Sequence, residues 1–307
     1  MRDPHAGATI RAHPDAHGTP HGSPCAAHAA RPARCAIVAR VPLRSTPFTV
    51  TAMNSSTRVS NVRAIVTGHT RGLGAALAEQ LLQQGIAVLG LSRSRHATLA
   101  AQAGDRLAEV ELDLSNPSAV ATWLAGDTLR SFVNGASIVL LFNNAGVVEP
   151  IGPLAAQDPV TIAGAVGLNV ATPLMLSAAI AHATSGPTEL RIVHVSSGAA
   201  RNAYAGWSVY CATKAALDHH ARAVALDTNR ALRICSVAPG VVDTGMQATI
   251  RATGTDRFPL RDKFDQLKAS GALATPDAAA RQLIGYALSD AFGSVPTADV
   301  RELPPVL

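Results

Sequence analysis

Tyr210 and Lys214 have the residue types and the spacing needed for proton transfer to a substrate oxygen. They lie four residues apart where a long helical pattern begins, so both project from one helical face. A lysine ammonium beside a phenol stabilises the phenolate, and we therefore expect the pKa of Tyr210 to fall below its usual value of about 10. Ser197 could hydrogen-bond the same substrate oxygen and share its developing negative charge. The three side chains predict a site that donates a proton to an oxygen.

A glycine-rich segment, TGHTRGLG, covers residues 67–74. It lies between a short apolar run and a helical pattern. Its glycines are Gly68, Gly72 and Gly74. Glycine lets the backbone turn tightly and lets a pyrophosphate approach a helix N-terminus, where free N–H groups and the helix dipole favour an anion. A glycine triplet alone also fits an ordinary tight turn, but its position between strand and helix predicts dinucleotide binding.

The end of the second apolar run indicates which dinucleotide is bound. An acidic residue there would hold a ribose 2′-hydroxyl, but the chain has Ser92, Arg93, Ser94 and Arg95 in that place. Arg71, inside the glycine-rich segment, adds another cation. Guanidinium groups suit a 2′-phosphate, which favours NADP(H) over NAD(H). The alternative is that Arg93 and Arg95 are ordinary solvated surface groups.

Short apolar runs alternate with helical patterns from Val62 onward. Six runs read as buried strands, the third of them the weakest: 62–66, 86–91, 107–112, 138–142, 191–196 and 233–238. Four helical patterns lie between or beside them, at 73–84, 117–130, 158–184 and 210–229. This alternation predicts an α/β fold, a single Rossmann-type doubly wound parallel sheet with helices on both faces.

Six polar and glycine clusters in this order resemble the short-chain dehydrogenase/reductase family. The resemblance covers essentially residues 62–301. Its clusters are TGHTRGLG at 67–74, Asp113-Leu114, NNAG at 143–146, Asn169, Ser197 with Tyr210 and Lys214, and Pro239-Gly240 followed by Thr244. In open α/β sheets such clusters at strand ends line the ligand site.

The resemblance implies a nicotinamide-dependent oxidoreductase with a catalytic tetrad. Tyr210 would protonate a carbonyl oxygen while hydride arrives from the nicotinamide, and Ser197 would position that oxygen. Lys214 would also bind the nicotinamide ribose, and Asn169 would hold a water that links Lys214 to bulk solvent. Ser196 is an adjacent alternative to Ser197, but the family spacing of thirteen residues before the tyrosine selects Ser197.

The resemblance also implies the cofactor contacts. Asp113 would meet the adenine, Asn143 and Gly146 the sugar and phosphate, and the segment 239–244 the carboxamide. The full expected set of cofactor residues is Gly68, Thr70, Arg71, Gly72, Leu73, Gly74, Ser92, Arg93, Asp113, Leu114, Asn143, Ala145, Gly146, Tyr210, Lys214, Pro239, Gly240, Val242 and Thr244.

A narrower resemblance concerns the substrate. The segments SSGAARNAYAGWSVYCATKAALD and APGVVDTGMQATIR look like the branch that contains sepiapterin reductase and bacterial benzil reductase. That branch implies reduction of a ketone or vicinal diketone to a chiral hydroxy compound. Sepiapterin reductases anchor the pterin with an acid where this chain has Ala274 and Thr275, which favours a diketone or aryl ketone over a pterin.

Four residues are candidates for the substrate pocket. Tyr204 and Trp207 lie in the loop between Ser197 and Tyr210, where they could stack on an aromatic substrate, although loop aromatics serve equally often in simple packing. Val147 and Met246 are further candidates at the same mouth.

A rival hypothesis from another class is a non-catalytic, NADP(H)-sensing regulatory protein that keeps the fold without turnover. Such proteins typically lose the tyrosine or the lysine, whereas this chain has both.

The net charge of +5 belongs to the N-terminal segment. Residues 1–60 hold seven Arg and two acids (7 − 2 = +5), and the remaining residues hold 26 − 7 = 19 basic and 21 − 2 = 19 acidic groups. A neutral folded part predicts no nucleic-acid partner.

Residues 1–60 are rich in Ala, His, Pro and Arg, so we expect them to be disordered or a spurious extension. The true start is then expected at Met53, ahead of a domain over 61–307. A targeting peptide and a histidine metal site are weaker alternatives.

Partners and location follow from the remaining patterns. Apolar runs stay shorter than the roughly 18 residues of a membrane span, and no metal site is expected. The four cysteines have no paired short spacing, which favours reduced thiols and a cytoplasmic protein.

The helices near 158–184 and 210–229 are apolar on more than one face. Family members usually assemble through these helices, so we expect a homodimer or homotetramer acting on a small carbonyl substrate.

Overall fold

Seven parallel strands form one sheet in the part of the chain that the computed structural model describes, residues 61–184 and 186–303. The spatial order is β3-β2-β1-β4-β5-β6-β7, so the direction of winding reverses between β1 and β4. The strands are β1 (Val62–Thr67), β2 (Ala87–Ser92), β3 (Leu107–Glu111), β4 (Ile138–Asn143), β5 (Glu189–Val195), β6 (Leu232–Ala238) and β7 (Thr297–Asp299).

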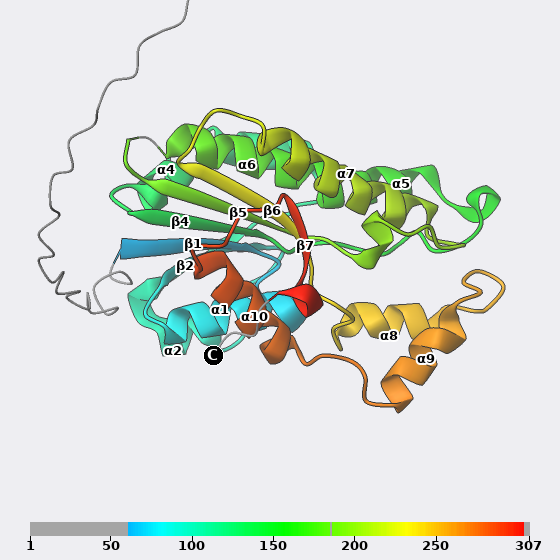
Figure 1. The fold of residues 1–307 in the computed structure, drawn as a ribbon. Helices are drawn as coiled ribbons and strands as arrows, with labels where there is room; N and C mark the ends of the chain where they lie inside the picture. The colour runs from blue at the N-terminus through cyan, green and yellow to red at the C-terminus, as the bar shows by residue number, and fades with distance from the viewer. Residues whose placement is uncertain (1–60, 185, 304–307) are drawn as a thin grey trace, which may run out of the picture. The chain divides into compact units, whose positions relative to one another are not determined.

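Helices cover both faces of the sheet (Figure 1) because successive strand residues point to opposite sides. Ala64 and Val66 of β1 pack in one apolar core and Ile65 between them packs in the other. The first core includes α1 (Gly72–Gln83), α2 (Leu99–Ala103) and α10 (Pro276–Leu288). The second includes α3 (Pro117–Leu124), α4 (Thr128–Val133), α6 (Thr172–Ala183) and α7 (Ser208–Val224). The predicted doubly wound fold is confirmed.

The run Pro159–Ala183 is one helical segment with a change of winding in its middle. It comprises α5 (Pro159–Val166), a π-helical turn (Gly167–Ala171) and α6. Of the helices in the described residues, this run is long and apolar enough to cross a membrane by length and composition. Leu176 and Ile180 of α6 are nevertheless fully buried against the sheet. The α6 part of the run is therefore a core helix of this α/β fold, while Val160 and Val166 of α5 are exposed.

Some elements differ from the sequence expectation. The helix predicted over 117–130 is two helices, α3 and α4, because the chain turns at Gly126, whose N–H donates to the Trp123 carbonyl. The three-residue β7 is too short to leave a period-two pattern. Two further helices, α8 (Gly245–Ala252) and α9 (Arg261–Ala269), follow β6. The predicted extension over 1–60 and the start at Met53 lie outside the described residues.

Candidate active site

Ser197, Tyr210 and Lys214 meet beside the carboxyl end of β5. Tyr210 and Lys214 occupy successive turns of α7, and both side chains are buried. The Lys214 Nζ atom lies 5.8 Å from the centre of the Tyr210 ring and donates a hydrogen bond to the Val195 carbonyl at 2.8 Å. Ser197 follows β5, and its hydroxyl oxygen accepts a hydrogen bond from the Ala199 N–H at 3.2 Å. The predicted grouping of these three residues is present.

Burial dominates the electrostatics of this group. It raises the pKa of Tyr210 to about 12, against the opposing effect of a hydrogen bond with Ser197. The expectation that Lys214 lowers the pKa of Tyr210 is therefore wrong for this arrangement, since desolvation disfavours the phenolate more than the neighbours favour it. Burial also lowers the pKa of Lys214 to about 8, while Asp218 acts in the opposite direction. Tyr210 thus holds its proton near neutral pH.

Asn169 lies in the π-helical turn, and its amide fixes the backbone next to Lys214. Its Oδ1 accepts from the Val147 N–H at 2.9 Å, and its Nδ2 donates to the Val147 carbonyl at 2.8 Å and to Thr213 Oγ1 at 3.1 Å. A Cβ on Gly146 would lie 3.2 Å from Asn169 Oδ1 and 3.6 Å from Lys214 Nζ. The absence of a side chain at Gly146 therefore leaves space beside both groups of the predicted tetrad.

The glycine-rich segment forms a tight turn that opens α1. Gly68 and Gly72 have φ values of +69° and +55°, which L side chains rarely adopt. A Cβ on Gly74 would lie 2.0 Å from the Gly68 carbonyl oxygen, so this close approach requires glycine. No side chain caps the first turn of α1. The N–H groups there remain directed at the turn, as an anion such as a pyrophosphate requires.

Thr67 and Asn144 join the glycine-rich turn to the NNAG segment. Thr67 Oγ1 accepts from the N–H groups of Asn144 and Ala145, each at 2.9 Å, and Asn144 Nδ2 donates to the Thr67 carbonyl at 2.9 Å. A Cβ on Gly72 would lie 3.2 Å from Thr244 Cγ2. The ends of β1, β4 and β6 are thus brought together. Sequence reasoning did not assign roles to Thr67 and Asn144, although both are polar residues at strand ends.

Asn143 does not share this surface. Its side chain is buried, and its Nδ2 lies 3.1 Å from His194 Nδ1 and 3.4 Å from Ser177 Oγ. The Leu114 side chain is buried as well, and its carbonyl accepts from Thr172 Oγ1 at 2.7 Å. The Asn143 Nδ2 group and the Leu114 carbonyl are therefore engaged inside the protein, whereas the buried Asn143 Oδ1 has no partner among the described residues.

The far end of the predicted cofactor site is basic. Arg71 and Arg93 are exposed and have no ion-pair partner among the described residues, whereas Arg95 pairs with Glu111 at 3.1 Å. Asp113 is exposed, and hydrogen bonds from Ser115 and the charge of Arg93 lower its pKa. Two of the three arginines are thus available to an anion.

An aromatic cluster surrounds Tyr210 on its other side. Trp207 is 4% exposed, stacks on Phe258 with ring centres 4.6 Å apart and meets the Tyr210 ring edge-on at 5.3 Å. Tyr204 and Phe264 contact Trp207 at 5.6 Å and 5.5 Å. Met246, another predicted pocket residue, packs against the same cluster, and so do Val148, Ile151, Ala199 and Ile250. Sequence reasoning missed Phe258 and Phe264 because they follow far along the chain.

A family model described as short chain dehydrogenase matches residues 62–255. The chain belongs to the short-chain dehydrogenase family. Members of this family are oxidoreductases that act on alcohols or carbonyl groups with a nicotinamide cofactor. The predicted family membership is confirmed.

Relatives of this short-chain dehydrogenase include enzymes with known substrates. The chain is 33% identical over 226 residues to benzil reductase ((S)-benzoin forming) of Bacillus cereus, covering 71% of this chain and 91% of that protein. It is 32% identical over 244 residues to sepiapterin reductase of Mus musculus, covering 75% and 93%. A short-chain dehydrogenase/reductase structure from Burkholderia vietnamiensis has 70% identity and a TM-score of 0.59, covering 80% of this chain and all of that one.

His69 is a buried residue of the glycine-rich turn that sequence reasoning passed over. A Cβ on Gly90 of β2 would lie 2.5 Å from the His69 ring, so the imidazole fills the space that this glycine leaves. His69 Nε2 lies 2.7 Å from Glu109 Oε1, which also accepts from the His96 N–H at 2.6 Å. The ring therefore ties the glycine-rich turn of this dehydrogenase to β3 through Glu109, which also holds the loop after β2. Gly90 was its sequence signal.

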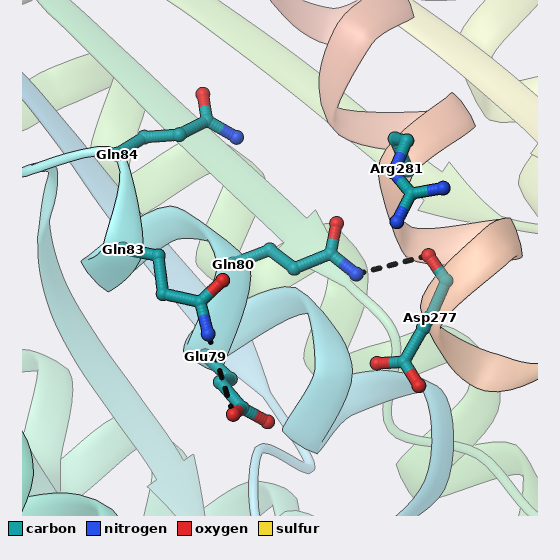
Figure 2. A pocket seen from close by; sticks show the side chains of 6 residues that line it. All are labelled: Glu79, Gln80, Gln83, Gln84, Asp277 and Arg281. Carbon is teal, nitrogen blue, oxygen red and sulfur yellow. Dashed lines mark hydrogen bonds between the residues drawn. The ribbon is translucent and has the colours of Figure 1, made fainter.

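A polar surface hollow of about 350 Å³ lies between α1 and α10, which pack in the core on the opposite face of the sheet from α7 (Figure 2). Gln80 Nε2 crosses it to the Asp277 carbonyl at 2.9 Å. None of the predicted site residues lines it; its lining is Glu79, Gln80, Gln83, Gln84, Asp277 and Arg281. Within the described residues, no group of three or more His, Cys, Asp or Glu side chains is placed to hold a metal ion.

Proposed function

We propose that this protein catalyses the NADPH-dependent reduction of a ketone or vicinal diketone to a chiral hydroxy compound, with Tyr210 as the general acid. The observation that carries the proposal is the grouping of Ser197, Tyr210 and Lys214 beside Gly146, whose neighbour Val147 is held by Asn169. These residues lie at the carboxyl edge of the sheet, where open α/β folds bind ligands.

The chain's own residues supply the proton and stabilise the charge. Bound nicotinamide would supply the hydride that the carbonyl carbon accepts. The Tyr210 hydroxyl donates its proton to the carbonyl oxygen, and the Ser197 hydroxyl stabilises the charge that develops on that oxygen. The Lys214 ammonium, on the same helix face, stabilises the phenolate that Tyr210 becomes. A neutral phenol before the reaction agrees with the raised pKa of Tyr210.

The basic surface beside the glycine-rich turn supports NADPH as the cofactor. Arg71 and Arg93 are exposed, and β2 ends in Ser92 without a carboxylate that would repel a 2′-phosphate. The turn at Gly68 and Gly74 provides the close backbone approach that a pyrophosphate needs.

The aromatic cluster around Trp207 supports an apolar, aromatic substrate next to Tyr210. The similarity to benzil reductases points to the same class. Sepiapterin-like reduction of a pterin is the second candidate, supported by the similarity to sepiapterin reductases. It is disfavoured because neither Ala274 nor Thr275 carries a carboxylate that could bind a pterin. Ala274 pairs with Val242 in an isolated bridge, and Thr275 caps α10.

A carbonyl panel with NADPH and NADH tests the proposal. We expect the absorbance of NADPH to fall on addition of benzil or 1-phenyl-1,2-propanedione, faster than with NADH and faster than with sepiapterin. Tyr210→Phe should lose turnover by a factor of roughly 100 to 10,000 while still binding NADPH. Preferred reduction of sepiapterin would select the second candidate. NADPH binding without consumption across the whole panel would instead support a non-catalytic, NADP(H)-sensing protein.

We further infer that the protein is a cytoplasmic homodimer or homotetramer that assembles through the helices near 158–184 and 210–229. An apolar hollow of about 430 Å³ lies between these helices. Its lining includes Ile162, Val166, Val170, Val209, Ala212 and Ala216. A second copy would cover this apolar surface, which a soluble protein seldom leaves open.

A further inference from the structure

Asp218 is a buried carboxylate that the proposed proton transfer does not use. It lies on α7 one turn after Lys214 and is 3% exposed. Its Oδ1 accepts hydrogen bonds from Ser196 Oγ and Ser236 Oγ, each at 2.7 Å, and its Oδ2 accepts from Arg201 Nε at 3.1 Å. A carboxylate this deep is costly to desolvate, and here both of its oxygens are bonded.

The partners of Asp218 lie on both sides of Ser197. Ser196 directly precedes Ser197, and Arg201 directly follows the short 3₁₀ turn Gly198–Ala200. Arg201 also donates through Nη2 to the Ala298 carbonyl of β7 at 3.1 Å. The turn that carries Ser197 is thus attached at both ends to one carboxylate of α7.

Lys214 also connects α7 to the end of β5, next to Ser196. Its Nζ donates to the carbonyl of Val195, the residue before Ser196. Helix α7 therefore forms two hydrogen bonds with the end of β5, from Lys214 to the Val195 carbonyl and from Ser196 to Asp218. The position of Ser197 relative to Tyr210 depends on these two attachments.

We propose that Asp218 is a positioning residue for the reduction: it fixes the Ser197 turn against the helix that carries Tyr210 and Lys214. This inference rests on the proposed function. Ser196 and Arg201 transmit the effect because they flank Ser197. Ser236 bonds the same oxygen of Asp218 from β6 without flanking Ser197, which makes it a matched control.

The charge of Asp218 has a second effect, on Lys214. Asp218 raises the pKa of Lys214 against the burial that lowers it to about 8. The other titratable or charged groups around this pair are Tyr210 on α7, His194 on β5, Cys235 on β6 and Arg201 after the 3₁₀ turn. Removal of the Asp218 charge should therefore make the Lys214 ammonium easier to deprotonate.

The first test compares kinetics of Ser196→Ala and Ser236→Ala, each of which removes one hydroxyl that donates to Asp218 Oδ1 at 2.7 Å. We expect Ser196→Ala to lower kcat by roughly 10- to 100-fold with the NADPH KM within about twofold, and Ser236→Ala to lower kcat by less than about threefold. Equal losses in kcat would show a merely structural role and overturn the proposal.

Asp218→Asn extends the test to the charge, with exposed Asp227→Asn as its control. The asparagine keeps an oxygen for the two serine hydroxyls but loses the ion pair with Arg201. We expect a fall in kcat of roughly 10- to 100-fold and a shift of the alkaline limb of the kcat profile to lower pH. An unshifted limb together with unchanged kcat would contradict the positioning role.

Hydrogen exchange of the amides of 198–202 gives a readout that needs no turnover. These amides should exchange faster in Ser196→Ala and Asp218→Asn than in Ser236→Ala, Asp227→Asn and the wild type. Unchanged exchange overturns the positioning role whatever the enzyme reduces. If these amides exchange faster but the protein reduces no carbonyl, Asp218 still fixes the Ser197 turn. In that case only the proposed function is refuted.

Discussion

Lys214 Nζ donates to the Val195 carbonyl at 2.8 Å, two residues before Ser197. One ammonium thus holds the end of β5 while it lies 5.8 Å from the centre of the Tyr210 ring. Because the charge of Lys214 serves both contacts, its loss should affect the position of β5 and the stability of the phenolate together.

The rate of carbonyl reduction should fall at alkaline pH as Lys214 loses its proton. Burial lowers the pKa of Lys214 to about 8, whereas that of Tyr210 is raised to about 12. The ammonium form is present below about 8, so kcat should be flat there and fall up to tenfold per pH unit above it. Steady-state measurement of kcat at saturating NADPH from about pH 6 to about pH 10 checks this. A constant kcat across that range would mean that the charge of Lys214 is not needed.

Arg93→Ala should weaken NADPH binding selectively. Arg93 is exposed and without an ion-pair partner among the described residues, so its guanidinium is available to a 2′-phosphate. We expect the Kd for NADPH to rise roughly 10- to 100-fold, with the Kd for NADH within about twofold, in fluorescence titrations. Arg130→Ala is the control, since Arg130 pairs with Asp127 at 2.9 Å on the distant helix α4. An equal loss of NADH binding would show that Arg93 acts on the loop and not on the phosphate.

Gly74→Ala should destabilise the fold and the cofactor site together. The new Cβ would lie 2.0 Å from the Gly68 carbonyl oxygen and 2.5 Å from Asn144 Nδ2, so the backbone of the turn must shift. We expect the free energy of unfolding to fall by about 1–3 kcal/mol in urea titrations, with weaker NADPH binding. Gly164→Ala is the control, because its Cβ would meet no atom within 4 Å in the helix α5. That variant should be unchanged or up to about 1 kcal/mol more stable. An unchanged free energy of unfolding for Gly74→Ala would contradict this prediction, because the turn would then accept the new Cβ without cost.

The parts of the site that sequence could predict are those carried by short segments. The turn at Gly68, the spacing of Tyr210 and Lys214, and the polar ends of the strands follow from local geometry, and the structure brings them together at the sheet edge. The six predicted strands are present with bounds shifted by a few residues at most, because short continuous apolar runs mark strands that are buried on both faces.

The parts that sequence could not predict depend on contacts between distant segments. The raised pKa of Tyr210 reflects its burial, which the residue four positions away does not reveal. Trp207 is packed between Tyr210 and Phe258, and Phe258 belongs to the segment after α8. The partners of Asp218 come from β6 and the turn after β5, so only its position one turn after Lys214 hinted at a role.

Val166→Asp should disrupt the proposed assembly. Val166 is a partly exposed residue of the apolar hollow on α5, and a carboxylate there would be buried without a partner by a second copy. We expect light scattering after size exclusion to give a dimer or tetramer for the wild type and a species near the chain mass of 31.5 kDa for the variant. Val295→Asp, at a valine 46% exposed that lies outside both helical segments, should leave the assembly intact. A wild type that elutes as a monomer would refute assembly through this surface.

The buried pair His194 and His220 should make the protein sensitive to acid. Their Nε2 and Nδ1 atoms lie 3.0 Å apart, and burial lowers the pKa of both, that of His194 to about 3. Between about 3 and the unfolded value of about 6.5, the unfolded chain binds more protons than the folded one. The contribution of His194 to stability is therefore complete above about 6.5 and is lost as the pH falls, by up to about 1.4 kcal/mol per pH unit. The lowered pKa of His220 acts in the same direction.

Substitution of His220 separates this effect from general acid sensitivity. Urea unfolding of His220→Gln at about pH 7 and about pH 5 should show a smaller loss of stability than the wild type, because one of the two protonation sites is gone. His219→Gln is the matched control on the same helix, since His219 is exposed and should leave the loss unchanged. An equal pH dependence in all three proteins would show that the protons are taken up elsewhere. The contact between His194 and Asn143 at 3.1 Å would place the remaining charge next to the last residue of the central strand β4.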